Sequence, residues 1–372
     1  MIKCAFVKGG ITVSILLLMT SVLTLDVFSQ DSDFHIYLAF GQSNMEGNAK
    51  PESQDLSGVD SRFQLLPAVN WPDGSRTKGT WTTAEPPLCR NGTGLCPADY
   101  FGRTLVDSLP EQIKIGIINV SVAGCAMDMF MKDNYQSYIG GEAGWMKNIA
   151  NEYGGNPYGR LVEMGKLAQE DGIIKGILLH QGETDAYKSG WADKVKSVYN
   201  DLIDDLKLDA SRVPLLAGDL LSTSGAVQNL PTTLPNSYVI SSKDLRGSDQ
   251  WHFTADSYRE FGKRYAETML EILREQEETG SRKAGAATAS GYGLNCGNGI
   301  NAVSFEIPER AFVSLMVYTL NGREIAELAG RAYAAGVHVL SSVSVKRSMS
   351  TGVFILKMKS GSFAMARSIL VE

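Results

Sequence analysis

The chain has 372 residues, of which 44% are hydrophobic, and its formal net charge at pH 7 is −6. This length is enough for one large domain and a smaller one. The negative charge and the lack of a Lys/Arg cluster argue against nucleic acid or an anionic membrane as the main partner.

The first 29 residues have the pattern of a secretory signal peptide. Lys3 and Lys8 precede an apolar stretch from Ile11 to Leu25, and Val27–Ser29 is spaced for cleavage before Gln30. A membrane anchor is the alternative, but this stretch is short for a span and is interrupted by Thr and Ser. We therefore expect export, with no membrane span left in the mature chain.

The mature chain would keep four cysteines, an even number that permits disulfide bonds. Cys89 and Cys96 flank a short loop, and we expect them to pair. Cys125 and Cys296 lie in different predicted domains, and we leave them unpaired. The cysteine spacing and the presence of only four histidines argue against a zinc site, so we expect no metal and no other cofactor.

From residue 34 to about 274, apolar runs alternate with amphipathic segments. The predicted strands are continuous apolar segments rich in Ile, Leu and Val, as in a sheet covered on both faces. They span 34–40, 113–120, 173–179, 213–218 and 238–241. Helical spacing predicts helices at 98–109, 159–169 and 191–206, and a last helix from Thr254. The repeated β-then-α order predicts a parallel sheet between helical layers over residues 30–274.

The stretch from Met45 to Pro97 interrupts this alternation and is rich in Pro, Gly, Ser and Thr. It follows the first predicted strand, so it would rise from the carboxyl edge of the sheet, where open α/β sheets bind their ligands. Long loops of this kind in compact domains are often functional. A disordered insertion is the alternative.

The composition changes after Arg274. Residues 275–293 carry charge and then Gly, Ala and Ser, which predicts a linker. In residues 294–372, strand-like runs at 311–320, 336–345 and 353–358 are separated by turn sequences such as Asn321-Gly322. These runs predict a small antiparallel β-sandwich without a catalytic cluster.

Ser43 follows the first predicted strand directly. A serine there is often only a helix N-cap, but such a turn also presents a nucleophilic hydroxyl if a base lies nearby. Asp249 and His252 follow the last predicted strand, and their spacing in a tight turn lets both side chains project to one side. Asp249 would orient the imidazole while its other nitrogen faces Ser43. We expect His35 and His338 to be structural.

A third polar group, residues 180–185, follows the strand at 173–179. Polar groups at the end of a buried strand are costly unless they are used. Acyl transfer needs N–H donors aimed at the developing oxyanion. The side chain of Gln181 and the backbone of Ser43 and Gly124 could supply them, although Gly124 could equally be a simple turn glycine.

These blocks together resemble those of the SGNH hydrolases: Gly41–Met45, Gly124, His180–Glu183 and Asp249-x-x-His252. More narrowly, they are similar to the carbohydrate acetylesterases, both the sialate O-acetylesterase-like group and the acetyl xylan esterases of carbohydrate esterase family 6. The resemblance covers about residues 34–271. It implies a three-layer α/β/α, flavodoxin-like fold and ester hydrolysis without a metal.

The resemblance also implies roles for individual residues. Ser43 would be the nucleophile, His252 the base and Asp249 its orienting acid. Ser43, Gly124 and Gln181 would donate to the oxyanion, with Gln181 in place of the Asn that is typical of SGNH hydrolases. Glu183 is open between two roles: a second carboxylate near His252, or a group that bonds the backbone N–H groups of its own loop.

The implied substrate is an acetylated polysaccharide of the plant cell wall, above all xylan. Acetylated sialic acid is one alternative, and a non-catalytic glycan-binding protein on an esterase scaffold is another. We expect Trp71, Trp81 and Trp145 to stack on sugar rings, although a Trp is more often part of the core.

Three runs of the C-terminal segment, Val317–Ile325, Ala335–His338 and Ser350–Leu356, resemble the sorting domains of the type IX secretion system. This resemblance implies an address that is read by the export machinery of a Gram-negative bacterium. It also implies a secreted or cell-surface location. A carbohydrate-binding β-sandwich is the alternative.

Overall fold

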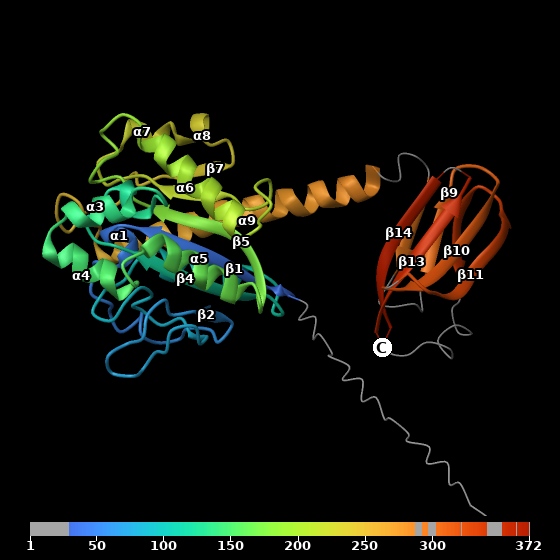
Figure 1. Ribbon diagram of the computed structural model, residues 1–372, viewed down its shortest axis with the longest axis horizontal. Helices are drawn as coiled ribbons and strands as arrows, with labels where there is room; N and C mark the ends of the chain where they lie inside the picture. The colour runs from blue at the N-terminus through green and yellow to red at the C-terminus, as the bar shows by residue number, and fades with distance from the viewer. Residues whose placement is uncertain are drawn as a thin grey trace, which may run out of the picture. The chain divides into compact units, whose positions relative to one another are not determined.

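The computed structural model describes residues 30–286, 292–296, 303–320, 322–340, 352–361 and 363–371 (Figure 1). The predicted signal segment lies outside these ranges. The chain divides into two compact units, Met1–Glu267 and Thr268–Glu372. Among the described helices, none has both the length and the apolar character that a membrane span requires.

The first unit is built on a seven-stranded sheet with the order β3-β2-β4-β1-β5-β6-β7. Its pairs are parallel except for β2 with β3, which confirms the predicted fold class. The strands are β1 (Asp31–Gly41), β2 (Phe63–Leu65), β3 (Thr82–Thr83), β4 (Lys114–Ser121), β5 (Gly172–His180), β6 (Leu215–Gly218) and β7 (Ser237–Ile240). The segment 45–97, which showed no periodicity in the sequence, supplies β2 and β3.

Helices cover both faces of this sheet. On one face, side chains of α5 and α6 join those of β1 in a continuous apolar core, and Figure 1 shows α5 in front of the strands. On the other face, the Phe101 ring of α2 meets the Tyr37 ring of β1 at 4.8 Å. The Tyr265 hydroxyl of α9 donates to the carbonyl of Leu179 in β5 at 2.8 Å. The three layers therefore match the predicted α/β/α arrangement.

The long helices of this unit are α2 (Pro97–Ser108), α5 (Pro157–Ala168) and α6 (Trp191–Asp205). A fourth, α9 (Ala255–Ala286), begins in this unit and runs past its last residue, Glu267. The short ones are α1 (Ser43–Glu46), η1 (Met127–Phe130), α3 (Tyr135–Gly141), α4 (Gly144–Glu152), α7 (Gly225–Gln228) and α8 (Leu230–Thr233). Helix α9 continues beyond Arg274 into the predicted linker. Glu, Arg, Gln and Lys in this segment are strong helix formers, which explains why the helix does not end there.

The second unit consists of two antiparallel sheets, which confirms the expected all-β region. One has the order β11-β10-β13-β14 and the other β12-β9-β8. The strands are β8 (Gly293–Cys296), β9 (Val303–Ile307), β10 (Ala311–Thr319), β11 (Glu324–Tyr333), β12 (Gly336–Leu340), β13 (Gly352–Ser360) and β14 (Phe363–Val371). Alternate residues of β10 point into a core that also contains Phe305 and Leu356.

Three neighbouring strands of the first unit end at the same level. Gly41 at the end of β1 is the register partner of Ser121 in β4 and of His180 in β5. A side chain at Gly41 would place its Cβ 2.0 Å from the His180 carbonyl oxygen, so only glycine fits here. The turns that follow these strands therefore meet at one edge of the sheet.

Candidate active site

Ser43, His252 and Asp249 form a hydrogen-bonded chain at this edge. The Nε2 atom of His252 lies 2.9 Å from Ser43 Oγ, and Nδ1 lies 2.7 Å from Asp249 Oδ2. The serine and the histidine come from opposite ends of the first unit, yet their side chains are in contact. The arrangement has the connectivity of a nucleophile, its general base and the carboxylate that orients the base.

The Ser43 hydroxyl does not act as a helix cap. Ser43 is the first residue of α1, and the N-cap position belongs to Gln42, whose side chain makes no capping bond. Gln42 is itself fixed by donation of its N–H to the His180 carbonyl at 3.0 Å. The strand-to-helix turn thus presents the Ser43 hydroxyl to His252 rather than to its own backbone.

Asp249 is held as an anion. Its Oδ1 accepts the backbone N–H groups of Trp251 and His252 at 2.7 and 2.8 Å, while Oδ2 faces the imidazole. The hydrogen bond to His252 and these two N–H donors lower the pKa of Asp249 to about 2. One short loop therefore carries His252 together with the carboxylate that is hydrogen-bonded to its imidazole.

Asn44 links the serine turn to this loop. Its Nδ2 donates to the Trp251 carbonyl at 2.9 Å and to Glu183 Oε1 at 2.5 Å, and its Oδ1 accepts the Tyr258 hydroxyl. Asn44 is fully buried. In the sequence, Asn44 is only one member of the Gly41–Met45 motif. Its place directly after the nucleophile was the one signal that could have indicated this role.

Two backbone N–H groups near Ser43 are free to donate. Within the described ranges, neither the N–H of Ser43 nor that of Gly124 has a hydrogen-bond partner. The Gly124 turn is held beside the serine turn because Val122 N–H donates to the Gly41 carbonyl at 3.0 Å. Gly124 has φ of +67°, a conformation that favours glycine. These two N–H groups are therefore candidates for the oxyanion site.

The Gln181 side chain is occupied by the protein itself. Its Nε2 lies 2.6 Å from Asp185 Oδ1, 3.1 Å from the Cys125 carbonyl and 3.3 Å from Gln42 Oε1. Its Oε1 accepts the Trp191 indole N–H at 2.6 Å, and Gln181 is only 1% exposed. In this arrangement Gln181 holds the loop next to Gly124 and aims no free N–H at an oxyanion.

Glu183 bonds Asn44 and is not hydrogen-bonded to His252. Its Oε1 also lies 3.3 Å from Nδ1 of His180, a buried ring packed edge-on against Phe253. The Glu183 side chain is only 7% exposed, and its Oε2 has no hydrogen-bond partner in the described part of the chain. The sequence left two roles open for Glu183, and the geometry favours neither. Glu183 makes no hydrogen bond to His252, and its contacts are with the side chains of Asn44 and His180 rather than with the N–H groups of its own loop.

A buried ion pair fixes the end of α1, the helix that begins at Ser43, and was not indicated by the sequence. Arg90 contacts Glu46 at 2.5 Å and Glu152 at 2.9 Å, and the side chains of Arg90 and Glu46 are 9% and 11% exposed. Glu46 Oε1 also accepts the Ala123 N–H at 3.1 Å. The pair therefore connects α1 to the turn that carries Gly124.

Trp81 is not brought to this site. Its ring packs on Phe34 with centroids 4.7 Å apart, and its Nε1 donates to Asp171 Oδ2 at 2.8 Å. Phe34 lies in the first part of β1, and the seven residues from there to Gly41 span about 23 Å of strand. Trp81 thus belongs to the opposite end of the sheet.

The other two tryptophans differ from each other. Trp71 is partly buried against the core, beneath the Arg76 guanidinium at 4.3 Å. Trp145 is 53% exposed, and its ring reaches within 2.9 Å of the position that a Cβ on Gly124 would occupy. Of the three predicted aromatic contacts, only Trp145 lies beside a residue proposed for the chemistry.

The predicted disulfide between Cys89 and Cys96 is wrong. Both are buried free thiols, as is Cys125. Cys89 Sγ lies 3.1 Å from the Tyr153 hydroxyl, whereas Cys96 Sγ lies 3.7 Å from Asn119 Nδ2. The two thiols thus point to different partners. The side chain of Cys296 lies outside the described residues.

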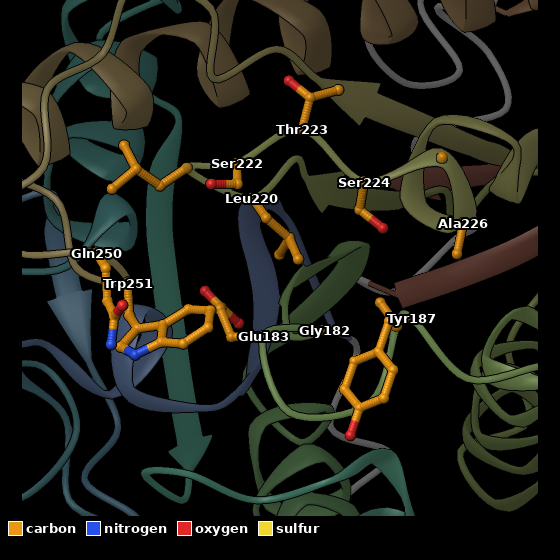
Figure 2. A pocket seen from close by; sticks show the side chains of 13 residues that line it. Gly182, Glu183, Tyr187, Leu220, Ser222, Thr223, Ser224, Ala226, Gln250 and Trp251 are labelled. Atoms are coloured by element: carbon orange, nitrogen blue, oxygen red, sulfur yellow. The ribbon is translucent and has the colours of Figure 1, made fainter.

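A cavity of about 530 Å³ adjoins the loop that carries Asp249 and His252 (Figure 2). Figure 2 shows Glu183 and the Trp251 indole on one side of the cavity and Tyr187 on the other. Trp251 is 48% exposed and Tyr187 is 78% exposed. The lining residues are Gly182, Glu183, Ala186, Tyr187, Leu220, Leu221, Ser222, Thr223, Ser224, Gly225, Ala226, Gln250 and Trp251. No cluster of His, Cys, Asp or Glu suited to a metal occurs among the described residues.

Several solved structures resemble this chain. A protein from Arabidopsis thaliana is 19% identical, with 64% of this chain and 98% of that chain covered and a TM-score of 0.50. A carbohydrate acetylesterase from Xanthomonas citri is 16% identical, covering 86% and 74%, with a TM-score of 0.47. NanS is 18% identical, covering 66% and 99%, with a TM-score of 0.46. At these identities the likeness concerns the fold.

A family model described as "Carbohydrate esterase, sialic acid-specific acetylesterase" matches residues 33–271. This range is more than half of the chain and contains every residue of the hydrogen-bonded site. The chain therefore belongs to this family of carbohydrate acetylesterases.

Proposed function

We propose that this chain is a serine esterase that removes O-acetyl groups from plant cell-wall polysaccharide, xylan in particular. The observation that carries the proposal is the position of His252, 2.9 Å from Ser43 Oγ and 2.7 Å from Asp249 Oδ2. A serine, an imidazole and a carboxylate connected in this order support nucleophilic acyl transfer.

The proposed reaction has two steps. Ser43 Oγ attacks the acetyl carbonyl while His252 Nε2 takes the serine proton, and the N–H groups of Ser43 and Gly124 bind the oxyanion. His252 then protonates the sugar oxygen, which leaves, and Ser43 carries the acetyl group. In the second step His252 takes a proton from water and the water oxygen attacks the acetyl carbon. The bond from this carbon to Ser43 Oγ then breaks, His252 returns the proton to Ser43 Oγ, and the acetic acid that leaves ionises to acetate.

The experiment is acetate release from acetylated xylan and from O-acetylated sialic acid, with Ser43→Ala as the control. We expect the intact chain to release acetate and Ser43→Ala to show no rate above background. Equal rates for the two proteins would contradict the serine mechanism. Binding of both substrates without release of acetate would instead support a non-catalytic glycan-binding protein.

Acetylated sialic acid is the second candidate substrate. The description of the matching family names sialic acid, which favours this candidate directly. The mechanism would be the same, because only the leaving alcohol differs. Faster acetate release from sialic acid than from xylan at equal ester concentration would select this candidate.

We also propose that residues 1–29 direct export and that residues 294–372 are read by secretion machinery, which would place the enzyme outside the cell. The support is the sequence pattern of both segments. Deletion of residues 294–372 should leave the esterase inside the producing Gram-negative cell, as measured by activity in the medium. Retention of the separated segment on insoluble xylan would favour a carbohydrate-binding role.

A further inference from the structure

The cavity beside the loop that carries Asp249 and His252 is lined by one carboxylate, that of Glu183. Glu183 lines this cavity, and its side chain is only 7% exposed. Oε1 is used by Asn44 at 2.5 Å, whereas Oε2 has no partner in the described part of the chain. Because Oε2 is also shielded from solvent, the charge of this carboxylate acts on a ligand in the cavity through space rather than through a hydrogen bond.

The remaining lining has the character of a sugar site. Trp251 and Tyr187 offer aromatic faces, on which the C–H face of a pyranose can stack. Ser222, Thr223 and Ser224 add hydroxyl groups that can donate and accept. A cavity of about 530 Å³ lies in the range of small-molecule sites.

The charge of the cavity excludes one class of sugar. Glu183 is the only Asp, Glu, Lys or Arg among the described residues that line the cavity. Lys188 lies 5.5 Å from the Tyr187 ring but is not part of the lining. A sugar carboxylate in this cavity would meet the Glu183 carboxylate without a compensating guanidinium or ammonium group.

The position of the cavity connects it to the reaction. Trp251 lies between Gln250 in the lining and the catalytic His252, and its carbonyl accepts from Asn44 at 2.9 Å. Ser43 itself is not among the lining residues. The cavity is therefore placed to hold the alcohol part of the ester, next to the imidazole that would protonate the leaving oxygen.

We infer that this cavity binds the ring of an uncharged sugar and that the negative charge of Glu183 selects against sugar acids. The inference rests on the proposed esterase function and names its substrate class. It assigns Glu183 a specificity-determining role, which differs from both roles that the sequence had left open.

The test compares two esters that differ only in charge. A methyl glucoside and the corresponding methyl glucuronide, each acetylated on the same ring oxygen, are offered separately to the intact chain. We expect kcat/KM to be at least tenfold higher for the uncharged glucoside. A ratio within twofold of one would overturn the assignment, and this measurement needs no variant that has to fold.

Glu183→Gln then tests the residue itself. Gln keeps an oxygen for Asn44 but removes the negative charge, so we expect the glucoside-to-glucuronide ratio of kcat/KM to fall at least threefold. A purely structural role would lower both rates and leave their ratio unchanged. Glu111→Gln, an exposed glutamate just before β4, is the matched control and should keep the wild-type ratio.

The two failures can be told apart. No acetate release from either ester by the intact chain would refute the proposed function, and with it this assignment. Acetate release with an unchanged ratio in Glu183→Gln would refute only the assignment of Glu183.

Discussion

At the scale of single residues, Asp249 is the group whose charge matters most for the base. Its pKa of about 2 follows from the hydrogen bond to His252 and from two backbone N–H donors. Because the pKa in the folded protein lies below the ordinary value of 3.8 for an aspartate, the stabilisation by this carboxylate is present above pH 3.8 and is lost as the pH falls toward 2. Asp249 therefore stays ionised at every pH at which the enzyme would work.

We accordingly predict that Asp249→Asn lowers kcat by about 10³- to 10⁴-fold, the range seen when a triad loses its orienting carboxylate. The change removes the anion that stabilises the imidazolium while leaving an oxygen for the N–H groups of the loop. Hydrolysis of p-nitrophenyl acetate measures the loss, with the melting temperature as the folding control. Wild-type turnover in this variant would refute the assigned role.

The buried thiols give a second residue-scale prediction. Burial raises the pKa of Cys89 to about 12 and that of Cys96 well above its ordinary value, so neither forms a reactive thiolate near neutral pH. Without reductant, both should resist alkylation in the native protein and react fully after denaturation. Mass spectrometry of the Cys89 and Cys96 peptides measures this. If both cysteines resisted alkylation in denaturant until reductant was added, the disulfide between Cys89 and Cys96 would be present after all.

Among the elements, α2 contains a carboxyl group that opposes stability at high pH. Asp99 caps this helix by accepting the Cys96 N–H at 2.9 Å, but its Oδ1 is buried without a partner. Burial raises the pKa of Asp99 from 3.8 to about 7. The folded state then binds the proton more tightly than the unfolded state, so this group lowers the free energy of unfolding as the pH rises from about 4 to 7.

We therefore predict that Asp99→Asn flattens this dependence. Asn keeps an oxygen for the Cys96 N–H and cannot ionise. The free energy of unfolding of the variant should therefore equal that of the wild type at pH 4 and exceed it by at most about 4 kcal/mol at pH 8. Thermal unfolding across this pH range measures the difference. If the free energy of unfolding of the variant fell with pH as steeply as that of the wild type, Asp99 would not be responsible for the pH dependence.

The turn that carries Gly124 depends on α1 through the buried pair of Glu46 and Arg90. Replacing Arg90 alone by Met should destabilise the protein by about 3–5 kcal/mol, because Glu46 would be left as an unpaired buried charge. The double variant Glu46→Leu, Arg90→Met should recover part of this stability. It should still have a lower kcat, because Ala123 N–H loses its acceptor. Recovery of both properties would show that the pair does not position the turn.

The long central strands of the sheet could be predicted from the sequence, whereas the shortest strands and helix α3 could not. The strands β1, β4 and β5 were predicted within a few residues, because long runs of Ile, Leu and Val occur only where both faces are buried. The strands β2 and β3 have three and two residues, too few to show a period. Helix α3 has no buried residue, so no apolar stripe indicated it.

The site was predictable to the extent that it follows strand ends. Ser43 and His252 were expected to meet because each follows a strand of one parallel sheet. The pair of Glu46 and Arg90 leaves no such pattern, since nothing in the local sequence indicates which distant charge a buried glutamate contacts. The cavity was missed for the same reason, because its lining comes from three separate loops.

At the scale of the whole molecule, the described site residues all lie in the first of the two compact units. We predict that a chain ending at Ala286, after the last helix, hydrolyses p-nitrophenyl acetate with a kcat within twofold of the full chain. A matched comparison uses the full chain without residues 1–29. A loss larger than tenfold, with unchanged circular dichroism, would show that the second unit contributes to the reaction.

The hydrogen bond between Ser43 and His252 joins residues 209 positions apart. The ribosome makes the nucleophile early and its base late, so a growing chain has a serine but no group to activate it. Hydrolytic power thus appears only when nearly the whole first unit has been synthesised and folded. An incomplete nascent chain that lacks His252 therefore cannot hydrolyse esters in the cell that makes it.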